Sequence, residues 1–352
     1  MSTIASNLTT LSLDTKREII QHLDLRSLAA LGQTDKLFKI LTDSQLSKFI
    51  QAIQCPPSQE SPIQQIKSHV EELYAKADQL KDNRIQHLLT QPKTLENVSL
   101  LQKFLKARDI LILWSKILPN APMLDQLKTC DAVIENADGF SDTFNQNKQQ
   151  LIANTTFLDL QGIYFDDRAA PHKLTHIPSE LFELSQLKFL DLRNNLLTEI
   201  PDEIGNLTNL QHLALCRNSL KTLPSKIVIL KTLNNLILRH NKLESLPLGM
   251  TSLTLNILNL KHNQLSFLPN DFHNISCAYL DITNNQFSSI PRFPNAMKLL
   301  CNSNLLPLTT QAAKVCNDNR KKIIAGGKAI IAIAALGLAY YNIGLICPSL
   351  FN

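Results

Sequence analysis

The second half of this 352-residue chain repeats itself every 22 or 23 residues, and no other feature limits its possible folds as strongly. The repeat units open, in chain order, at Leu187, Leu210, Leu233, Leu255, Cys277 and about residue 296. Each unit follows the pattern L-x-x-L-x-L-x-x-N-x-L, more loosely in the last two. A unit this short cannot bury its own apolar side. Such units therefore stack on one another and share one continuous core, as in a solenoid.

The spacing within a unit predicts one short strand. Leucines at positions four and six, such as Leu213 and Leu215, lie two residues apart and point to the same side of a strand. Stacked strands would form a parallel sheet with leucine along its inner side. An Ile-Pro or Leu-Pro step, such as Leu223-Pro224, then ends the turn and starts the outer arc, because proline fixes φ and has no N–H to donate.

Position nine is asparagine in five successive units. These residues are Asn195, Asn218, Asn241, Asn263 and Asn285. Each has apolar neighbours, and a buried amide must be hydrogen-bonded. We therefore expect these side chains to bond the backbone of their own turn and of the adjacent repeat.

The repeated residues resemble a leucine-rich repeat solenoid of the short LxxLPxxI class, over about residues 151–308. A degenerate first unit at 155–165 precedes an insertion, DDRAAPHK, at 166–173. The segment FSSIPRFPNAMKLL at 287–300 is similar to repeat proteins secreted by bacterial pathogens. The resemblance implies a horseshoe that binds a protein partner on its concave face and does not catalyse a reaction.

Positions three, five, seven and eight of each unit should face the concave side. The predicted partner-binding residues are Phe189, Asp191, Arg193, His212, Arg217, Ile237, Arg239, His240, Ile257, Lys261 and Tyr279. A cation recurs in four successive units, as Arg193, Arg217, Arg239 and Lys261. Since strands stack about 4.8 Å apart, these cations should form one basic column. The column favours an acidic partner, and ordinary solvation of like charges is the alternative.

Residues 8–50 predict three short helices. Thr15 and Glu18 can form a capping box for the first helix, and the second ends near Gly32. Thr34 or Asp35 can cap the third. A core this small usually needs a partner or a neighbouring domain for its stability.

This segment resembles an F-box. The matching residues are Leu11, Asp14, Ile19, Leu23, Asp24, Ser27, Leu28 and Phe38. Ser12 stands where the family has proline, Gln33-Thr34 replace the usual Val-Cys, and Phe38 replaces tryptophan. An F-box followed by leucine-rich repeats is an architecture of substrate receptors in Skp–cullin–F-box ubiquitin ligases. The resemblance implies contacts to a Skp-type adaptor by Leu11, Ile19, Leu23 and Leu28. The alternative is an unrelated helical cap.

Two further segments have apolar patterns. Residues 60–150 carry apolar residues at helical spacing, with an amphipathic helix around Trp114, and predict a helical spacer that caps the first repeat. Near the carboxyl terminus, the run from Ala329 to Cys347 has 19 residues without a charge. About 20 such residues cross a bilayer core, so 323–347 predicts a transmembrane tail. A buried helix that caps the solenoid is the alternative.

Composition and motifs argue against catalysis and cofactors. The 35 Lys and Arg residues exceed the 30 Asp and Glu residues by only 5, which is too few to indicate nucleic-acid binding. Nine glycines in the whole chain disfavour a glycine-rich nucleotide-binding enzyme. No common hydrolase, metalloprotease or P-loop motif is present. His172 and His176 in and after the insertion indicate a solvated loop rather than a metal site.

The sequence thus predicts a non-catalytic adaptor without cofactor or metal, built from helices followed by an α/β solenoid. Its expected role is to hold a protein target on the repeats while residues 8–50 bind a Skp-type adaptor. The alternative is a membrane-tethered repeat scaffold, or effector, with no role in ubiquitin transfer. The expected location is the cytosolic face of a membrane in a eukaryotic cell, which would be the host cell of a bacterial effector.

Overall fold

The computed structural model describes residues 62–118, 124–162, 172–288 and 296–300, together with Ser47, Lys48 and Gln51. The predicted F-box-like residues Leu11, Ile19, Leu23 and Leu28 and the predicted tail at 323–347 lie outside these ranges. Within them, no helix has the length and apolarity needed to cross a bilayer. The chain divides into two compact units, Met1–Leu210 and Gln211–Asn352.

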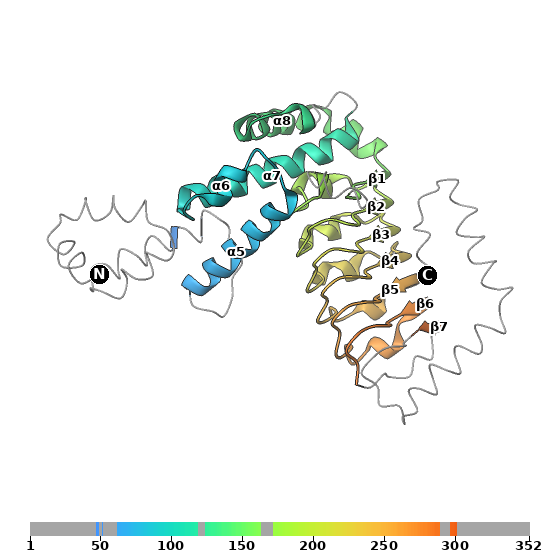
Figure 1. The fold of residues 1–352 in the computed structure, drawn as a ribbon. Coiled ribbons are helices and arrows are strands. Elements are labelled where there is room, and N and C mark those ends of the chain that lie inside the picture. Colours follow the sequence, from blue (N-terminus) through green and yellow to red (C-terminus); the bar gives the residue numbers. More distant parts are fainter. Residues whose placement is uncertain are drawn as a thin grey trace, which may run out of the picture. The chain divides into compact units, whose positions relative to one another are not determined.

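The first unit begins with helices. They are α5 (Pro62–Leu80), α6 (Gln86–Thr90), α7 (Leu95–Ile117), the 3₁₀ helix η1 (Leu124–Gln126) and α8 (Cys130–Asn154). Thr94 and Thr129 accept hydrogen bonds from backbone N–H groups of the first turns of α7 and α8, and these caps fix where the two helices begin. Helices α7 and α8 pack against each other, with the Trp114 and Phe144 rings 4.8 Å apart (Figure 1).

Helix α7 is buried on more sides than its sequence predicted. Its polar residues Arg108 and Asp109 are 0% and 1% exposed, and their side chains form an ion pair of 2.7 Å. Contacts with α5, α8 and the first strand surround the helix. The expected amphipathic helix with a solvated polar face is therefore a core helix of the first unit.

The buried ion pair connects α7 to the first repeat. Asp109 Oδ2 accepts hydrogen bonds from Thr175 N, Thr175 Oγ1 and His176 N at 2.9, 2.6 and 2.7 Å. The Arg108 guanidinium donates to the Lys173 carbonyl at 2.8 Å. Residues 173–176 are thus anchored on α7 rather than forming part of a solvated loop. This bonding supports the expected role of the helices as a cap on the first repeat.

The repeats form parallel strands in both units. In the first compact unit, β1 (Phe157–Asp159) pairs in register with β2 (Phe189–Asp191). The degenerate repeat at 155–165 is therefore a true repeat. In the second unit, the strands are β3 (His212–Ala214), β4 (Asn235–Ile237), β5 (Thr254–Asn259), β6 (Ser276–Asp281) and β7 (Ala296–Leu300). Their register aligns Leu213, Leu236, Leu258, Leu280 and Leu299. The predicted parallel sheet is confirmed.

Short 3₁₀ helices form the outer arc of the repeats. They are η3 (Ser179–Glu183) and η4 (Asp202–Asn206) in the first unit, and η5 (Ser225–Ile229), η6 (Met250–Ser252) and η7 (Phe272–Asn274) in the second. Pro178, Pro201 and Pro224 precede the first three of these helices with φ of −58°, −63° and −64°. This agrees with the predicted use of proline to start the arc. Between the arc and the strands of the second unit, leucines such as Leu236 and Leu238 are 0% exposed.

The position-nine asparagines form a ladder of hydrogen bonds along the core. The Asn241 side-chain amide donates to the carbonyls of Leu238 in its own turn and Leu215 in the preceding repeat, at 2.9 and 3.0 Å. Its Oδ1 accepts from Leu220 N at 3.1 Å. Asn263 and Asn285 repeat this pattern. Each asparagine therefore satisfies buried backbone groups of two successive repeats.

Removing one rung of this ladder should destabilise the fold. We expect Asn241→Ala to lower the free energy of unfolding by about 1–3 kcal/mol, because it leaves buried backbone groups unbonded. Urea titration followed by circular dichroism measures the loss. Asn234→Ala is the matched control, since that side chain is exposed and its loss should change the free energy by less than about 0.5 kcal/mol. Equal losses in the two variants would contradict a structural role of the ladder.

Candidate protein-binding face

The strands of the second unit expose one side. Positions four and six are buried leucines, whereas positions three and five point to the opposite side and are mostly half-exposed. We call this opposite side, with positions seven and eight that follow it, the sheet face. It contains most of the residues predicted to bind a partner, and no described helix of the second unit covers it (Figure 1).

An apolar strip runs across β3, β4, β5 and β6 on the sheet face. It consists of Ala214, Ile237, Ile257 and Tyr279, all half-exposed. Ile257 and Tyr279 are direct register partners, and Ile237 is the diagonal neighbour of Ile257. Burial raises the pKa of Tyr279, so its phenol stays protonated and neutral. The strip therefore offers uncharged surface to a partner.

A cationic ridge follows the apolar strip, at the ends of β3, β4 and β5. We define this ridge as Arg217, Arg239, His240, Lys261 and His262. Backbone hydrogen bonds continue here beyond the strands, from Arg217 N to Arg239 O at 3.0 Å and from His240 N to Lys261 O at 2.9 Å. The same ladder that pairs the strands therefore fixes the ridge residues side by side.

Position eight adopts the left-handed backbone conformation in five successive repeats. The residues are Asn194, Arg217, His240, His262 and Asn284, with φ between 55° and 58°. Asparagine and histidine tolerate this conformation better than most residues other than glycine, which explains four of the five identities. The turn places the asparagine at position nine in the core. It also brings the His240 and His262 rings into a stack 4.3 Å apart.

Both ridge histidines are neutral at pH 7. Burial, with His262, Arg217, Arg239 and Lys261 nearby, lowers the pKa of His240 to about 4. Burial and the cations Lys261 and Arg239 lower the pKa of His262, while Asp281 opposes this shift. The charge of the ridge at pH 7 therefore comes from Arg217, Arg239 and Lys261.

Two of the four cations in the predicted basic column, Arg193 and Arg239, are buried. Arg193, in the first unit, is 7% exposed and forms a buried ion pair with Asp191, where Nε lies 2.8 Å from both carboxylate oxygens. A further bond of 2.9 Å joins Arg193 to Gln161. Arg239 is 4% exposed. Arg217 and Lys261 are half-exposed, so they are the cations that a partner can reach most readily.

In two repeats an acid at position five bonds the side chain at position seven. Asp191 precedes and neutralises Arg193, and Asp281 accepts a 2.7 Å hydrogen bond from Thr283 Oγ1. In β3, β4 and β5 this position holds Ala214, Ile237 and Asn259 instead. The sequence alone could have shown this signal, because the spacing Asp-x-Arg within a strand places the two side chains on the same side.

The remaining predicted face residues are placed as follows. His212 Nδ1 lies 2.6 Å from the side-chain amide of Asn235 on the neighbouring strand. Phe189, in the first unit, stacks on Phe157 with ring centroids 4.7 Å apart, and Phe157 is 40% exposed. Sequence reasoning did not single out Phe157, although it occupies position three of the degenerate unit.

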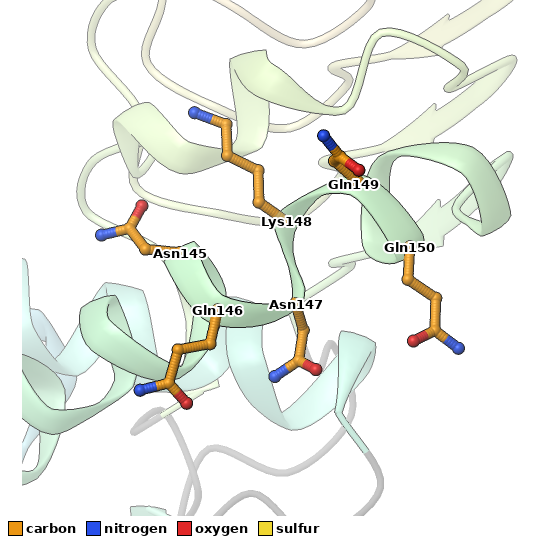
Figure 2. Close-up of a pocket in the computed structure, with 6 residues that line it drawn as sticks. All are labelled: Asn145, Gln146, Asn147, Lys148, Gln149 and Gln150. Carbon is orange, nitrogen blue, oxygen red and sulfur yellow. The ribbon is translucent and has the colours of Figure 1, made fainter.

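The described cysteines and the hollow along α8 offer no reactive or metal-binding cluster. Burial raises the pKa of the Cys130 and Cys277 thiols to about 11, so neither is a thiolate at neutral pH. No group of three His, Cys, Asp or Glu residues in this part of the chain could hold a metal ion. A hollow along α8 is lined by the consecutive polar residues 145–150, whose side chains point to different sides of the helix and do not converge (Figure 2).

Comparison with known proteins agrees with the repeats. Residues 155–266 match the family model of a leucine-rich repeat region. A search of curated protein sequences found no match.

Three solved structures illustrate the likeness. A leucine-rich repeat protein of Leptospira interrogans is 29% identical, with 49% of each chain covered and a TM-score of 0.39. The Drosophila Toll–Spätzle complex is 30% identical over 44% of this chain and 23% of that one, with a TM-score of 0.38. The leucine-rich repeat domain of a Shigella effector is 26% identical over 49% of this chain and 69% of that one, with a TM-score of 0.35. This chain thus spans about half of the Leptospira protein and less than a quarter of the chain in the Toll complex.

Residues 155–266 therefore match a leucine-rich repeat region, and the repeat strands within each compact unit run parallel. This class of fold is typical of protein-interaction scaffolds without catalytic activity.

Proposed function

We propose that this chain is a non-catalytic adaptor that holds a protein partner on the sheet face of its leucine-rich repeats. One observation carries the proposal: the strands that bury their leucines completely leave apolar and cationic side chains half-exposed on the other side. Large apolar residues on a solvated surface cost free energy unless a partner covers them. A broad row of half-exposed side chains along parallel strands suits a protein surface better than a small enclosed ligand.

A crosslinking experiment tests this use of the sheet face. A photoreactive amino acid at Ile237, on the sheet face, should give a discrete partner adduct in cells that express the full chain. The same amino acid at Ile229 should not, because that residue is 48% exposed but lies on the 3₁₀ helix η5 of the outer arc. Mass spectrometry of the adducts identifies the partner. Equal adducts from both positions, or adducts from Ile229 alone, would contradict the proposal.

We further propose that residues 8–50 bind a Skp-type adaptor and so present the partner to a cullin-type ubiquitin ligase. Support comes from the F-box-like pattern of residues 11–38 and from its position ahead of the repeats. The double variant Leu11→Ala/Leu28→Ala of the full chain should reduce Skp binding at least tenfold in calorimetry, since buried leucines typically contribute about 2–5 kcal/mol. The sheet-face crosslink should persist. If the unaltered chain does not bind Skp, a scaffold without a ubiquitin role replaces this proposal.

We also propose that residues 323–347 anchor the chain in a membrane and leave the repeats in the cytosol of a eukaryotic cell. Support comes from the 19 uncharged residues from Ala329 to Cys347 and from the basic flank Arg320-Lys321-Lys322. The full chain should stay with membranes after alkaline carbonate extraction, and a chain that ends at residue 322 should be released with its repeats folded. A truncated chain that aggregates, beside a full chain soluble without detergent, would indicate a structural cap.

A further inference from the structure

The cationic ridge indicates which kind of partner surface the sheet face accepts, and this inference rests on the proposed function of that face. We infer that the ridge binds an acidic segment of the partner protein, and that His240 and His262 take up protons as the segment binds. The apolar strip then contacts the uncharged side chains of the same segment.

The charge arrangement around the ridge favours an acidic ligand. Arg217, Arg239 and Lys261 come from three successive repeats. Arg239 and Lys261 occupy position seven of neighbouring repeats, about 4.8 Å apart along the stack, and Arg217 occupies position eight of the preceding repeat, where its backbone N–H donates to Arg239 O. None of these cations follows an aspartate at position five, in contrast to Arg193. A chain of carboxylates laid across the strands would thus reach the half-exposed Arg217 and Lys261 with charge-assisted hydrogen bonds, and the buried Arg239 in the repeat between them would add its positive charge.

The stacked histidines couple this binding to protons. His240 faces Arg217 from the preceding repeat, Arg239 from its own repeat, and Lys261 and His262 from the next repeat. His262 faces Arg239, Lys261 and Asp281, and its ring lies 2.9 Å from the Asn284 amide. In the free protein these cations and burial keep both rings neutral. A carboxylate bound beside the stacked rings offsets the cations and favours the protonated form, so the pKa of both rings rises on binding.

The sign of the pH effect follows from this linkage. Between the low pKa of the free protein and the higher pKa of the complex, the complex holds more protons than the free protein. Affinity therefore increases as the pH falls, by at most about tenfold per pH unit for each histidine. The ligand remains charged over this range, because glutamate has an ordinary pKa of about 4.3.

The repeats themselves supply conservative variants. In the repeat of β6, positions seven and eight are Thr283 and Asn284, and the left-handed backbone at Asn284 matches that of the ridge. Arg217→Asn/Lys261→Thr therefore removes two ridge charges, and His240→Asn/His262→Asn removes both titratable rings, with residues that this backbone already holds. The matched control is Lys221→Gln/Lys226→Gln, which removes two charges from exposed lysines outside the strands.

The experiment measures binding of a fluorescent oligoglutamate peptide to the full chain by anisotropy, with oligoglutamine as the uncharged probe. We expect oligoglutamate to bind more tightly at about pH 5.5 than at about pH 7.5, by threefold or more, and oligoglutamine not to bind. The charge variant should weaken binding at least tenfold, the control by less than twofold, and the histidine variant should remove the pH dependence.

Equal binding by the charge variant and the control, or a pH-independent affinity of the unaltered chain, would overturn the inference. If the inference is overturned but the Ile237 position still gives a partner adduct, only the acidic segment is excluded. If the Ile237 position gives no adduct either, the proposed function fails as well.

Discussion

The hydrogen bonds of the position-nine asparagines are the interaction on which the repeats depend. A strand that ends after a few residues leaves carbonyl and N–H groups in the core without a partner, and an unbonded buried group costs about 1–3 kcal/mol. Asn241 meets this demand for two repeats at once, through Leu238, Leu215 and Leu220. These hydrogen bonds also need the left-handed backbone of His240, just before Asn241, because His240 turns the chain so that the amide can enter the core.

This constraint in the core also determines the surface. Since position eight must turn and position nine must be buried, the side chains of position eight stand next to one another from repeat to repeat. The stacked rings of His240 and His262 result from that geometry. What the side chains do there depends on nearby identities. Aspartate at position five converts the following cation into a buried ion pair in one repeat, and its absence from the next three leaves the ridge basic.

Sequence reasoning predicted those parts of the fold that local periodicity encodes. The two-residue spacing of Leu213 and Leu215, the buried asparagines and the proline steps each have a cause within one repeat, and the structure has all three. The burial of Arg108 and Asp109 has no such local cause. It depends on Thr175 and on packing against α8, far away in the chain, so the helix pattern alone indicated a solvated face. Arg193 is buried for another reason: the aspartate two residues before it forms an ion pair with its guanidinium.

The separation of core and surface positions explains how such a scaffold can change partners without losing its fold. Position eight holds asparagine, arginine and histidine in successive repeats with nearly the same φ, so the backbone there accepts very different side chains. Position nine holds only asparagine in those repeats, and in the second unit its amide group can donate to two carbonyls while its Oδ1 accepts from a backbone N–H. Exchanges among these three residue types at position eight therefore alter charge and proton affinity and keep the left-handed backbone. In the second unit position eight holds one cation, Arg217, and the two neutral histidines, next to the position-seven cations Arg239 and Lys261. Recognition of an anionic partner can use this combination.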